Sequence, residues 1–259
     1  IEPVLGEGAV LGSNTSTIPI VRLASMFRQP ERLVGLHFFH PVGQRPLVEI
    51  IRSEQTADRA FAGALAVAKA FDRPAILVGD SPGFVVNRLL MPYLTEAMEL
   101  LLEGVSIDRI ESVARSFGMA KGPLELLDEI GLDTTLHGGR ILWETWPDRI
   151  TVSPLLIPMY KKHLHGVKTG GGFFVYDPDG LTPAEVNPAA VELIAYWSRA
   201  SQESDSMTDE QIVERLLRPM ADEARRLLDE QVVTDPRDIQ LAALLALGFP
   251  EQHLDYLSV

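Results

Sequence analysis

A histidine and a glutamate in neighbouring apolar segments are the side chains best suited to acid–base chemistry. His37 lies in Gly-Leu-His-Phe-Phe-His-Pro, and Glu49 lies in Leu-Val-Glu-Ile. If residues 34–39 and 46–51 form an antiparallel strand pair, one register places His37 opposite Glu49. A carboxylate beside an imidazole orients the ring and stabilises its protonated form, as a general base acting on an alcohol requires. The alternative is a buried histidine that is hydrogen-bonded for structural reasons alone.

Hydroxyl and amide side chains occur at two further places that could serve a ligand. Ser13-Asn14-Thr15-Ser16-Thr17 follows the first predicted strand, where such residues cap the next helix or meet a ligand. Asn87 is a lone amide in the apolar run 85–90, where an unsatisfied polar group would cost free energy. We therefore expect Asn87 either to bond locally or to be directed at a ligand.

Two other patterns do not favour the sites that they superficially suggest. His37 and His40 form an H-x-x-H pair, but residues three apart on a strand point to opposite faces, and the chain has no cysteine to complete a metal site. The segment 6–12 is rich in glycine, but its spacing is wrong for a dinucleotide-binding loop and no strand precedes it. We expect no metal site.

The elements that must hold these residues follow from apolar patterning. Short apolar runs between turn residues predict strands, and helical spacing predicts the helices between them. The strands are expected at 9–11, 33–39, 47–51 and 75–78, and the helices at about 17–27 and 57–71. Residues 1–80 thus have α/β character. Ser81 can cap a helix and Pro82 suits a first turn, so a long apolar helix is predicted to begin there, and from there helices predominate.

An internal repeat divides the rest of the chain. The segment 85–92 returns as 212–219 at a constant offset of 127 residues, and the offset persists through Glu96 and Glu223. We therefore predict an α/β unit at 1–80, a helical unit at 81–176, a linker at 177–207 and a second, shortened helical unit at 208–259.

Composition excludes several classes of protein. The formal charge of −13 over 259 residues argues against a nucleic-acid partner. The absence of cysteine excludes disulfides and a cysteine nucleophile. No apolar run approaches the roughly 20 residues of a membrane span. The first residue is Ile1, so we expect the chain to be a fragment that begins within a domain.

Seven motifs follow one another along residues 1 to about 176. They are Ser-Asn-Thr-Ser at 13–16, Gly-Leu-His-Phe-Phe-His-Pro-Val at 35–42, Leu-Val-Glu-Ile at 47–50, Asp-Ser-Pro-Gly-Phe-Val-Val-Asn-Arg-Leu-Leu at 80–90, Gly-Pro-Leu-Glu-Leu-Leu-Asp at 122–128, Gly-Leu-Asp-Thr-Thr at 131–135 and Lys-Thr-Gly-Gly-Gly-Phe-Phe at 168–174. In order and spacing, these motifs resemble the 3-hydroxyacyl-CoA dehydrogenase family. The doubled helical unit is most similar to the dehydrogenase portion of the multifunctional alpha subunit of fatty-acid oxidation complexes.

The resemblance implies a fold and an activity. It implies the C-terminal part of a Rossmann-type NAD-binding domain at 1–80, followed by two copies of a mostly α-helical C-terminal domain, the second shortened. The implied reaction is the NAD-dependent oxidation of (S)-3-hydroxyacyl-CoA to 3-oxoacyl-CoA in fatty-acid β-oxidation. The implied partners are an acyl-CoA substrate and a second copy of the chain or a thiolase. The implied location is the cytoplasm of a bacterium, or the mitochondrial matrix or peroxisome of a eukaryote.

The resemblance also assigns roles to residues. His37 would be the general base on the 3-hydroxyl, and Glu49 would orient it. Ser16 and Asn87 would hydrogen-bond the substrate at its reacting end. Ser16 and Lys168 would lie near the nicotinamide. His40 stands where the family usually has an asparagine near the cofactor.

The sequence departs from the family pattern and leaves alternatives open. The glycine-rich loop and most of the Rossmann sheet are not in the chain, so the isolated chain is expected to be inactive. Leu245 stands where multifunctional enzymes can have a substrate-contacting tyrosine. One alternative is an assembly or dimerisation module, and another is a related sugar-acid dehydrogenase acting on a secondary alcohol.

Overall fold

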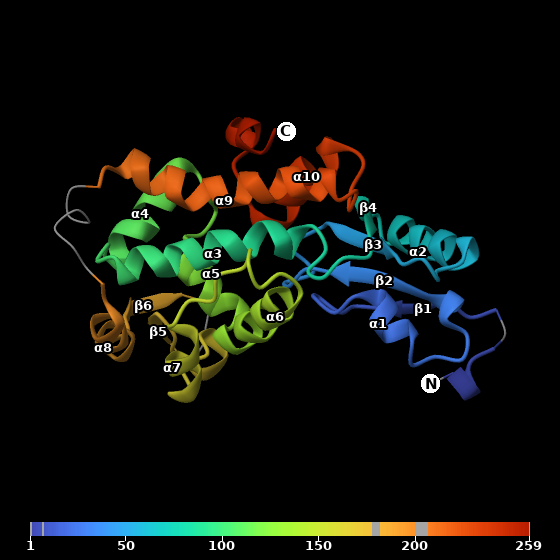
Figure 1. Cartoon of the computed structure of the whole chain (residues 1–259), viewed down its shortest axis with the longest axis horizontal. Coiled ribbons are helices and arrows are strands. Elements are labelled where there is room, and N and C mark those ends of the chain that lie inside the picture. Colours follow the sequence, from blue (N-terminus) through green and yellow to red (C-terminus); the bar gives the residue numbers. More distant parts are fainter. Residues whose placement is uncertain (1, 7, 178–181, 200–206, 259) are drawn as a thin grey trace. The chain divides into compact units, whose positions relative to one another are not determined.

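The computed structural model describes residues 2–6, 8–177, 182–199 and 207–258 (Figure 1). The chain divides into two compact units. The first contains Ile1–Leu89, Glu223–Leu247 and Leu254–Val259, and the second contains Leu90–Asp222 and Gly248–His253. Each unit is described by itself below.

The secondary structure changes from mixed to helical along the chain (Figure 1). In order, the helices and strands are β1 (Leu11–Ser13), α1 (Ile20–Ala24), β2 (Leu33–Phe38), β3 (Val48–Arg52), α2 (Asp58–Ala70), β4 (Ala75–Gly79), α3 (Val86–Leu102), α4 (Ile107–Phe117), α5 (Pro123–Ile130), α6 (Leu132–Thr145), α7 (Leu156–Lys161), β5 (Phe174–Tyr176), β6 (Pro183–Val186), α8 (Pro188–Trp197), α9 (Asp209–Asp229) and α10 (Pro236–Ala242), with short 3₁₀ or π turns at Glu2–Val4, Pro30–Arg32, Val167–Thr169, Ala243–Leu247 and Glu251–Leu257.

A four-stranded mixed sheet in the order β1-β2-β3-β4 forms the centre of the first unit. β1 runs parallel to β2, β2 antiparallel to β3, and β3 parallel to β4. The strands predicted at 33–39, 47–51 and 75–78 are confirmed to within one residue. The first strand is two residues later than predicted, at Leu11–Ser13.

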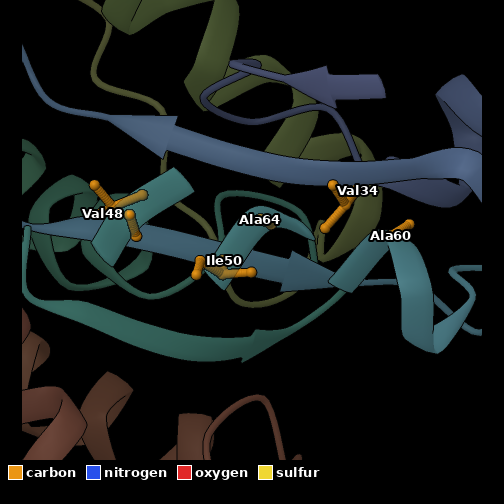
Figure 2. Close-up of a cluster of buried hydrophobic side chains, with 6 residues drawn as sticks. Val34, Val48, Ile50, Ala60 and Ala64 are labelled. Carbon is orange, nitrogen blue, oxygen red and sulfur yellow. The ribbon is translucent and has the colours of Figure 1, made fainter. Parts of the chain in front are cut away.

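One face of this sheet is covered by α2. Val34 from β2 and Val48 and Ile50 from β3 pack there against a stripe of alanines, Ala60, Ala64 and Ala68, spaced one turn apart on the helix (Figure 2). All six residues are at most 2% exposed, and the alanines let the helix backbone approach closely. Because side chains alternate along a strand, the residues between these valines and isoleucine point to the other face.

The opposite face carries Gly35 and His37 of β2 together with Glu49 and Ile51 of β3. A Cβ at Gly35 would lie 2.6 Å from the Cβ of Ile51, so the absence of a side chain there is required by packing. Alternation along both strands therefore places His37 and Glu49 side by side on the face that α2 leaves uncovered.

The long helix predicted from Ser81-Pro82 begins later, at Val86. Gly83 and Phe84 have φ angles of 74° and 52°, in the left-handed region, and such residues cannot continue a right-handed helix. The Ser81 hydroxyl does not cap the helix but accepts a hydrogen bond from the guanidinium of Arg88 at 3.1 Å. The predicted cap at Ser81 was therefore wrong, because sequence pattern does not reveal a left-handed turn at phenylalanine.

α1 is shorter than the helix predicted at 17–27, and a carboxylate from another element holds its first turn. Asp80, just after β4, accepts hydrogen bonds from the backbone N–H groups of Ile20 and Val21 at 2.7 and 2.6 Å. Burial raises the pKa of Asp80 although these two bonds favour its ionised form. The end of β4 thus positions the chain that follows β1.

In its described residues, the second unit is mostly helical and contains a two-stranded antiparallel sheet, β5-β6. Asp128 of α5 is fully buried and accepts hydrogen bonds from the backbone N–H groups of Phe173 and Phe174 at 2.9 Å and from the Tyr176 hydroxyl at 3.2 Å. Burial raises the pKa of Asp128 to about 7, against the lowering effect of these three bonds. This carboxyl group joins α5 to the glycine-rich turn before β5.

The structure bears on the predicted linker. The range 177–207, predicted as a linker, contains β6 and α8, and its residues 178–181 and 200–206 lie outside the described part. Within the described residues, no helix is long and apolar enough to cross a membrane.

Candidate active site

The pairing predicted between His37 and Glu49 is confirmed by the structure. The two residues are direct partners in the β2–β3 register. His37 Nδ1 lies 2.6 Å from Glu49 Oε2, and the side chains are 4% and 0% exposed. A buried carboxylate at this distance fixes the ring and selects the tautomer whose Nδ1 carries the proton.

The second oxygen of Glu49 is held by the start of α3. Glu49 Oε1 accepts hydrogen bonds from the backbone N–H groups of Val85 and Val86, both at 2.9 Å. N–H groups at a helix N-terminus have no partner within the helix and favour a negative charge. Glu49 is thus satisfied as a carboxylate on both oxygens. Sequence reasoning missed these donors because backbone groups have no residue-type signature.

With Nδ1 on Glu49, His37 presents its Nε2 to the hydroxyl of Ser16. The distance from His37 Nε2 to Ser16 Oγ is 3.2 Å. The imidazole is bordered by the rings of Phe39 and Phe84, whose centroids lie 4.4 and 5.8 Å from its own. Both phenylalanines are buried, so the ring has apolar neighbours, and the exposed Ser16 lies beside its Nε2.

In the polar segment 13–17 at the end of β1, some side chains bond to nearby backbone groups and one, that of Ser16, lies beside His37. Thr15 Oγ1 accepts a hydrogen bond from the N–H of Ile18 at 3.1 Å, and Asn14 Oδ1 accepts one from the N–H of Phe38 at 2.9 Å. These contacts tie the segment to itself and to the end of β2. Ser16 is left to face His37, so the capping alternative explains part of this segment only.

Asn87 bonds to the same segment. Its side-chain Nδ2 donates to the backbone carbonyl of Ser16 at 2.6 Å, and the side chain is half-buried. The lone amide in the apolar run therefore holds the backbone of the serine that faces His37. Its predicted hydrogen bond to a substrate stays a prediction.

The other two predicted site residues, His40 and Lys168, make no direct contact with the catalytic dyad of His37 and Glu49. His40 is exposed, just beyond the end of β2. Lys168 belongs to the second unit, where its Nζ donates to Asp133 Oδ1 at 2.6 Å and to Thr134 Oγ1 at 3.3 Å. Burial opposes ionisation of Asp133, but the hydrogen bond from Lys168 holds the pKa of that carboxyl below its usual value.

These contacts form one chain of groups, from the N-terminus of α3 through Glu49 and His37 to Ser16. A neutral imidazole whose Nδ1–H is held by a carboxylate has a free lone pair on Nε2. That atom can accept a proton from a hydroxyl beside Ser16, and Glu49 stabilises the resulting imidazolium. The arrangement is that of a general base for an alcohol.

Comparison with known proteins agrees with this chemistry. Residues 1–81 match the family model described as the NAD-binding domain of 3-hydroxyacyl-CoA dehydrogenase, and residues 83–176 match the model of the C-terminal domain. The chain belongs to the 3-hydroxyacyl-CoA dehydrogenase family. Its fold is accordingly a Rossmann-like NAD-binding domain followed by a helical C-terminal domain of this family.

Relatives within the family include larger proteins. The fatty acid oxidation complex subunit alpha of Acinetobacter baumannii is 36% identical over 248 residues, which cover 94% of this chain and 34% of the relative. The chain thus spans about a third of the length of the curated relatives it matches.

Two solved structures of dehydrogenases resemble the chain. (S)-3-hydroxybutyryl-CoA dehydrogenase from Ralstonia eutropha is 39% identical, with a TM-score of 0.64, over 68% of this chain and 64% of that one. The dehydrogenase part of multifunctional enzyme 1 from C. elegans is 27% identical, with a TM-score of 0.61, over 96% of this chain and 55% of that one.

In this 3-hydroxyacyl-CoA dehydrogenase family member, the edge of the sheet beside His37 is of the kind that binds nucleotide cofactors such as NAD. The parallel strands β1 and β2 end at the same edge of the sheet, where α/β folds bind nucleotides, and Ser16 and His40 follow them there. The 259 residues contain no G-x-G-x-x-G sequence to hold a pyrophosphate.

Proposed function

We propose that the protein containing this chain oxidises (S)-3-hydroxyacyl-CoA to 3-oxoacyl-CoA with NAD. The observation that carries the proposal is the buried Glu49–His37 pair, in which His37 Nε2 faces the Ser16 hydroxyl at 3.2 Å. Membership of the family and the names of its relatives support the substrate class.

In this mechanism the protein's residues handle the proton, and NAD, when bound, would supply the acceptor for the hydride that leaves C3. His37 Nε2 takes the proton of the 3-hydroxyl as the C–H bond at C3 breaks. Glu49 stabilises the imidazolium, and the α3 N–H groups of Val85 and Val86 stabilise Glu49. The Ser16 hydroxyl donates a hydrogen bond to the reacting oxygen and keeps it beside Nε2.

Further residues are proposed to complete the site. Asn87 holds the Ser16 backbone and binds substrate beside it. His40 and Lys168 contribute to the cofactor site. We also retain the domain limits 1–80, 81–176, 177–207 and 208–259, with the last range as a shortened copy of the helical domain. The location proposed for a bacterial protein of this kind is the cytoplasm.

The test is an activity assay on the complete gene product that contains this chain. The purified protein is given (S)-3-hydroxybutyryl-CoA and NAD, and NADH formation is followed by absorbance. We expect His37→Ala to lower kcat by about 10²–10⁴-fold, which is the contribution typical of a general base. His137→Ala, an exposed histidine on α6, serves as the matched control. Turnover by His37→Ala equal to that of the control variant would reject the mechanism.

Substrate controls separate this proposal from its alternatives. The (R)-enantiomer and free (S)-3-hydroxybutyrate are tested in the same assay. Equal turnover of the free acid would favour a dehydrogenase of other secondary alcohols. A protein with no turnover that forms a stable dimer, or a complex with a thiolase, in light scattering would favour the assembly module.

A further inference from the structure

The first turn of α3 carries a buried ion pair next to the catalytic contacts. Arg88 is 2% exposed, and its Nε donates to Glu223 Oε1 of α9 at 2.7 Å. Its Nη1 lies 2.7 Å from Glu230 Oε2 and donates to Ser81 Oγ at 3.1 Å. Glu223 is itself 3% exposed. All of these residues belong to the first unit.

Four consecutive residues at this turn face three different parts of the unit. Val85 and Val86 donate their backbone N–H groups to Glu49, and Asn87 donates to the Ser16 backbone. Arg88 then binds the carboxylate of Glu223. Residues 85–88 lie on about one helical turn, so a shift of the Arg88 backbone also moves the groups that donate hydrogen bonds to Glu49 and to the Ser16 carbonyl.

The internal repeat contains the same ion pair with its partners exchanged. At the offset of 127, Arg88 corresponds to Arg215, and Glu223 and Glu230 correspond to Glu96 and Glu103. In the second unit, Arg215 binds both Glu96 and Glu103. Each arginine thus pairs with carboxylates from the other copy, as residues do across a self-complementary interface.

The two ion pairs differ in what lies beside them. Asn87 corresponds to Glu214, so the second copy keeps the arginine–glutamate contacts without the polar residue of the site. Arg215 is 36% exposed at its side chain, whereas that of Arg88 is 1% exposed. The contacts of Arg215 with Glu96 and Glu103 in the second unit therefore serve as a control: they join helices as the Arg88–Glu223 pair does, but they have no site residue beside them.

We propose that Glu223 is a positioning residue for the catalytic dyad. Through Arg88 it fixes the first turn of α3, and this turn fixes Glu49 and Ser16 on either side of His37. Glu230, whose side chain is 37% exposed, reinforces the same arginine. The inference rests on the proposed function for its kinetic consequence, but its structural consequence at His37 can be observed without turnover.

The experiment compares Glu223→Gln with the matched variant Glu96→Gln in the complete gene product. Glutamine keeps an oxygen acceptor but removes the charge that holds the guanidinium. We expect Glu223→Gln to lower kcat by about tenfold to a hundredfold, as small misplacements of reacting groups do, with KM changed by less than about twofold. We expect Glu96→Gln to leave both constants near their wild-type values. Substrate deuterated at C3 should show a larger isotope effect with Glu223→Gln, because hydride transfer becomes more limiting.

A second measurement does not depend on activity. The ¹⁵N and ¹H NMR signals of the His37 ring report its hydrogen bond to Glu49, and His37→Ala assigns them. We expect these signals to shift or broaden in Glu223→Gln and to stay unchanged in Glu96→Gln. Unchanged His37 signals in folded Glu223→Gln would overturn the inference, even if the wild-type protein did not oxidise hydroxyacyl-CoA.

A double variant keeps the inference testable if Glu223→Gln does not fold. Arg88→Met with Glu223→Leu replaces the buried pair by apolar side chains of similar size, a change that proteins often tolerate. We expect the double variant to fold and to show disturbed His37 signals with a lowered kcat. Wild-type kcat and wild-type His37 signals in this variant would show that the pair only builds the helix contact. A wild-type protein without turnover, but with His37 signals that respond to Glu223, would reject the proposed function alone.

Discussion

Replacing Glu49 by glutamine tests the central chain of contacts most directly. Glu49 accepts three hydrogen bonds, two at Oε1 from Val85 and Val86 and one at Oε2 from His37. A glutamine side chain has one oxygen and one NH₂ group, so it cannot accept at both positions. The outcome depends on which way the amide turns.

The orientation of the amide follows from the cost of unpaired donors. If the NH₂ group faced Val85 and Val86, two buried N–H groups would lose their acceptor, at about 1–3 kcal/mol each. The oxygen therefore remains on α3, and the NH₂ group faces His37 Nδ1. His37 must then accept at Nδ1 and carry its proton on Nε2, where the base is needed.

A ring in the wrong tautomer cannot take the substrate proton. We expect Glu49→Gln to lower kcat by about 10²–10⁴-fold, the contribution of a general base, which corresponds to about 2.7–5.4 kcal/mol in the barrier. The exposed Glu54, changed to Gln, is the control. Stopped-flow or steady-state NADH formation gives kcat, and circular dichroism checks the fold. A folded Glu49→Gln protein with kcat within about threefold of wild type would refute this reasoning.

Four further outcomes are expected, all in the complete gene product. Ser16→Ala should lower kcat by about tenfold to a hundredfold, because it removes a hydrogen bond of about 1.5–3 kcal/mol to a charged group; a change of less than twofold in the NADH assay would exclude this role. Arg88→Ala should lower the free energy of unfolding in urea by about 3 kcal/mol, because the buried Glu223 carboxylate loses a buried guanidinium and keeps its contact with the half-exposed Arg226; the half-exposed Arg215→Ala should cost less than about 1 kcal/mol. Because the pKa of Asp128 is raised to about 7 in the folded protein, the folded chain binds more protons than the unfolded chain between about pH 4 and 7. The free energy of unfolding should therefore fall as pH rises through that window, by at most about 1.4 kcal/mol per pH unit. The same unfolding series on Asp128→Asn should lack this component. Gly172→Ala should destabilise by about 1–3 kcal/mol, because its Cβ would lie 1.9 Å from Asp128 Oδ1, and an unchanged melting temperature would contradict this.

Much of the local structure around the site could be predicted from the sequence. Alternating side chains place Val48 and Ile50 toward α2 and Glu49 on the other face, so the pairing of His37 with Glu49 follows from strand register alone. The alanine stripe of α2 likewise predicts a helix that packs closely on the sheet. These features depend on the period of strands and helices, which a single sequence displays.

Prediction from the sequence failed where an unusual backbone conformation or a contact with a distant residue determines the local structure. The start of α3 moved to Val86 because Phe84 adopts a left-handed conformation that no propensity assigns to phenylalanine. A hydroxyl predicted to cap this helix, that of Ser81, instead binds Arg88. Both departures occur at the turn that supplies hydrogen bonds to the site.

By itself, the sequence determined which side chains carry the chemistry of this protein. His37, Glu49 and Ser16 have the required residue types, and strand alternation brings the first two together. Only the tertiary structure decided what holds them in place. The donors to Glu49 are backbone N–H groups 36 and 37 residues away, and the partner of Arg88 is 135 residues away. Neither contact has a sequence pattern, because backbone groups are the same in every residue and an ion pair between distant segments forms only after both helices have packed.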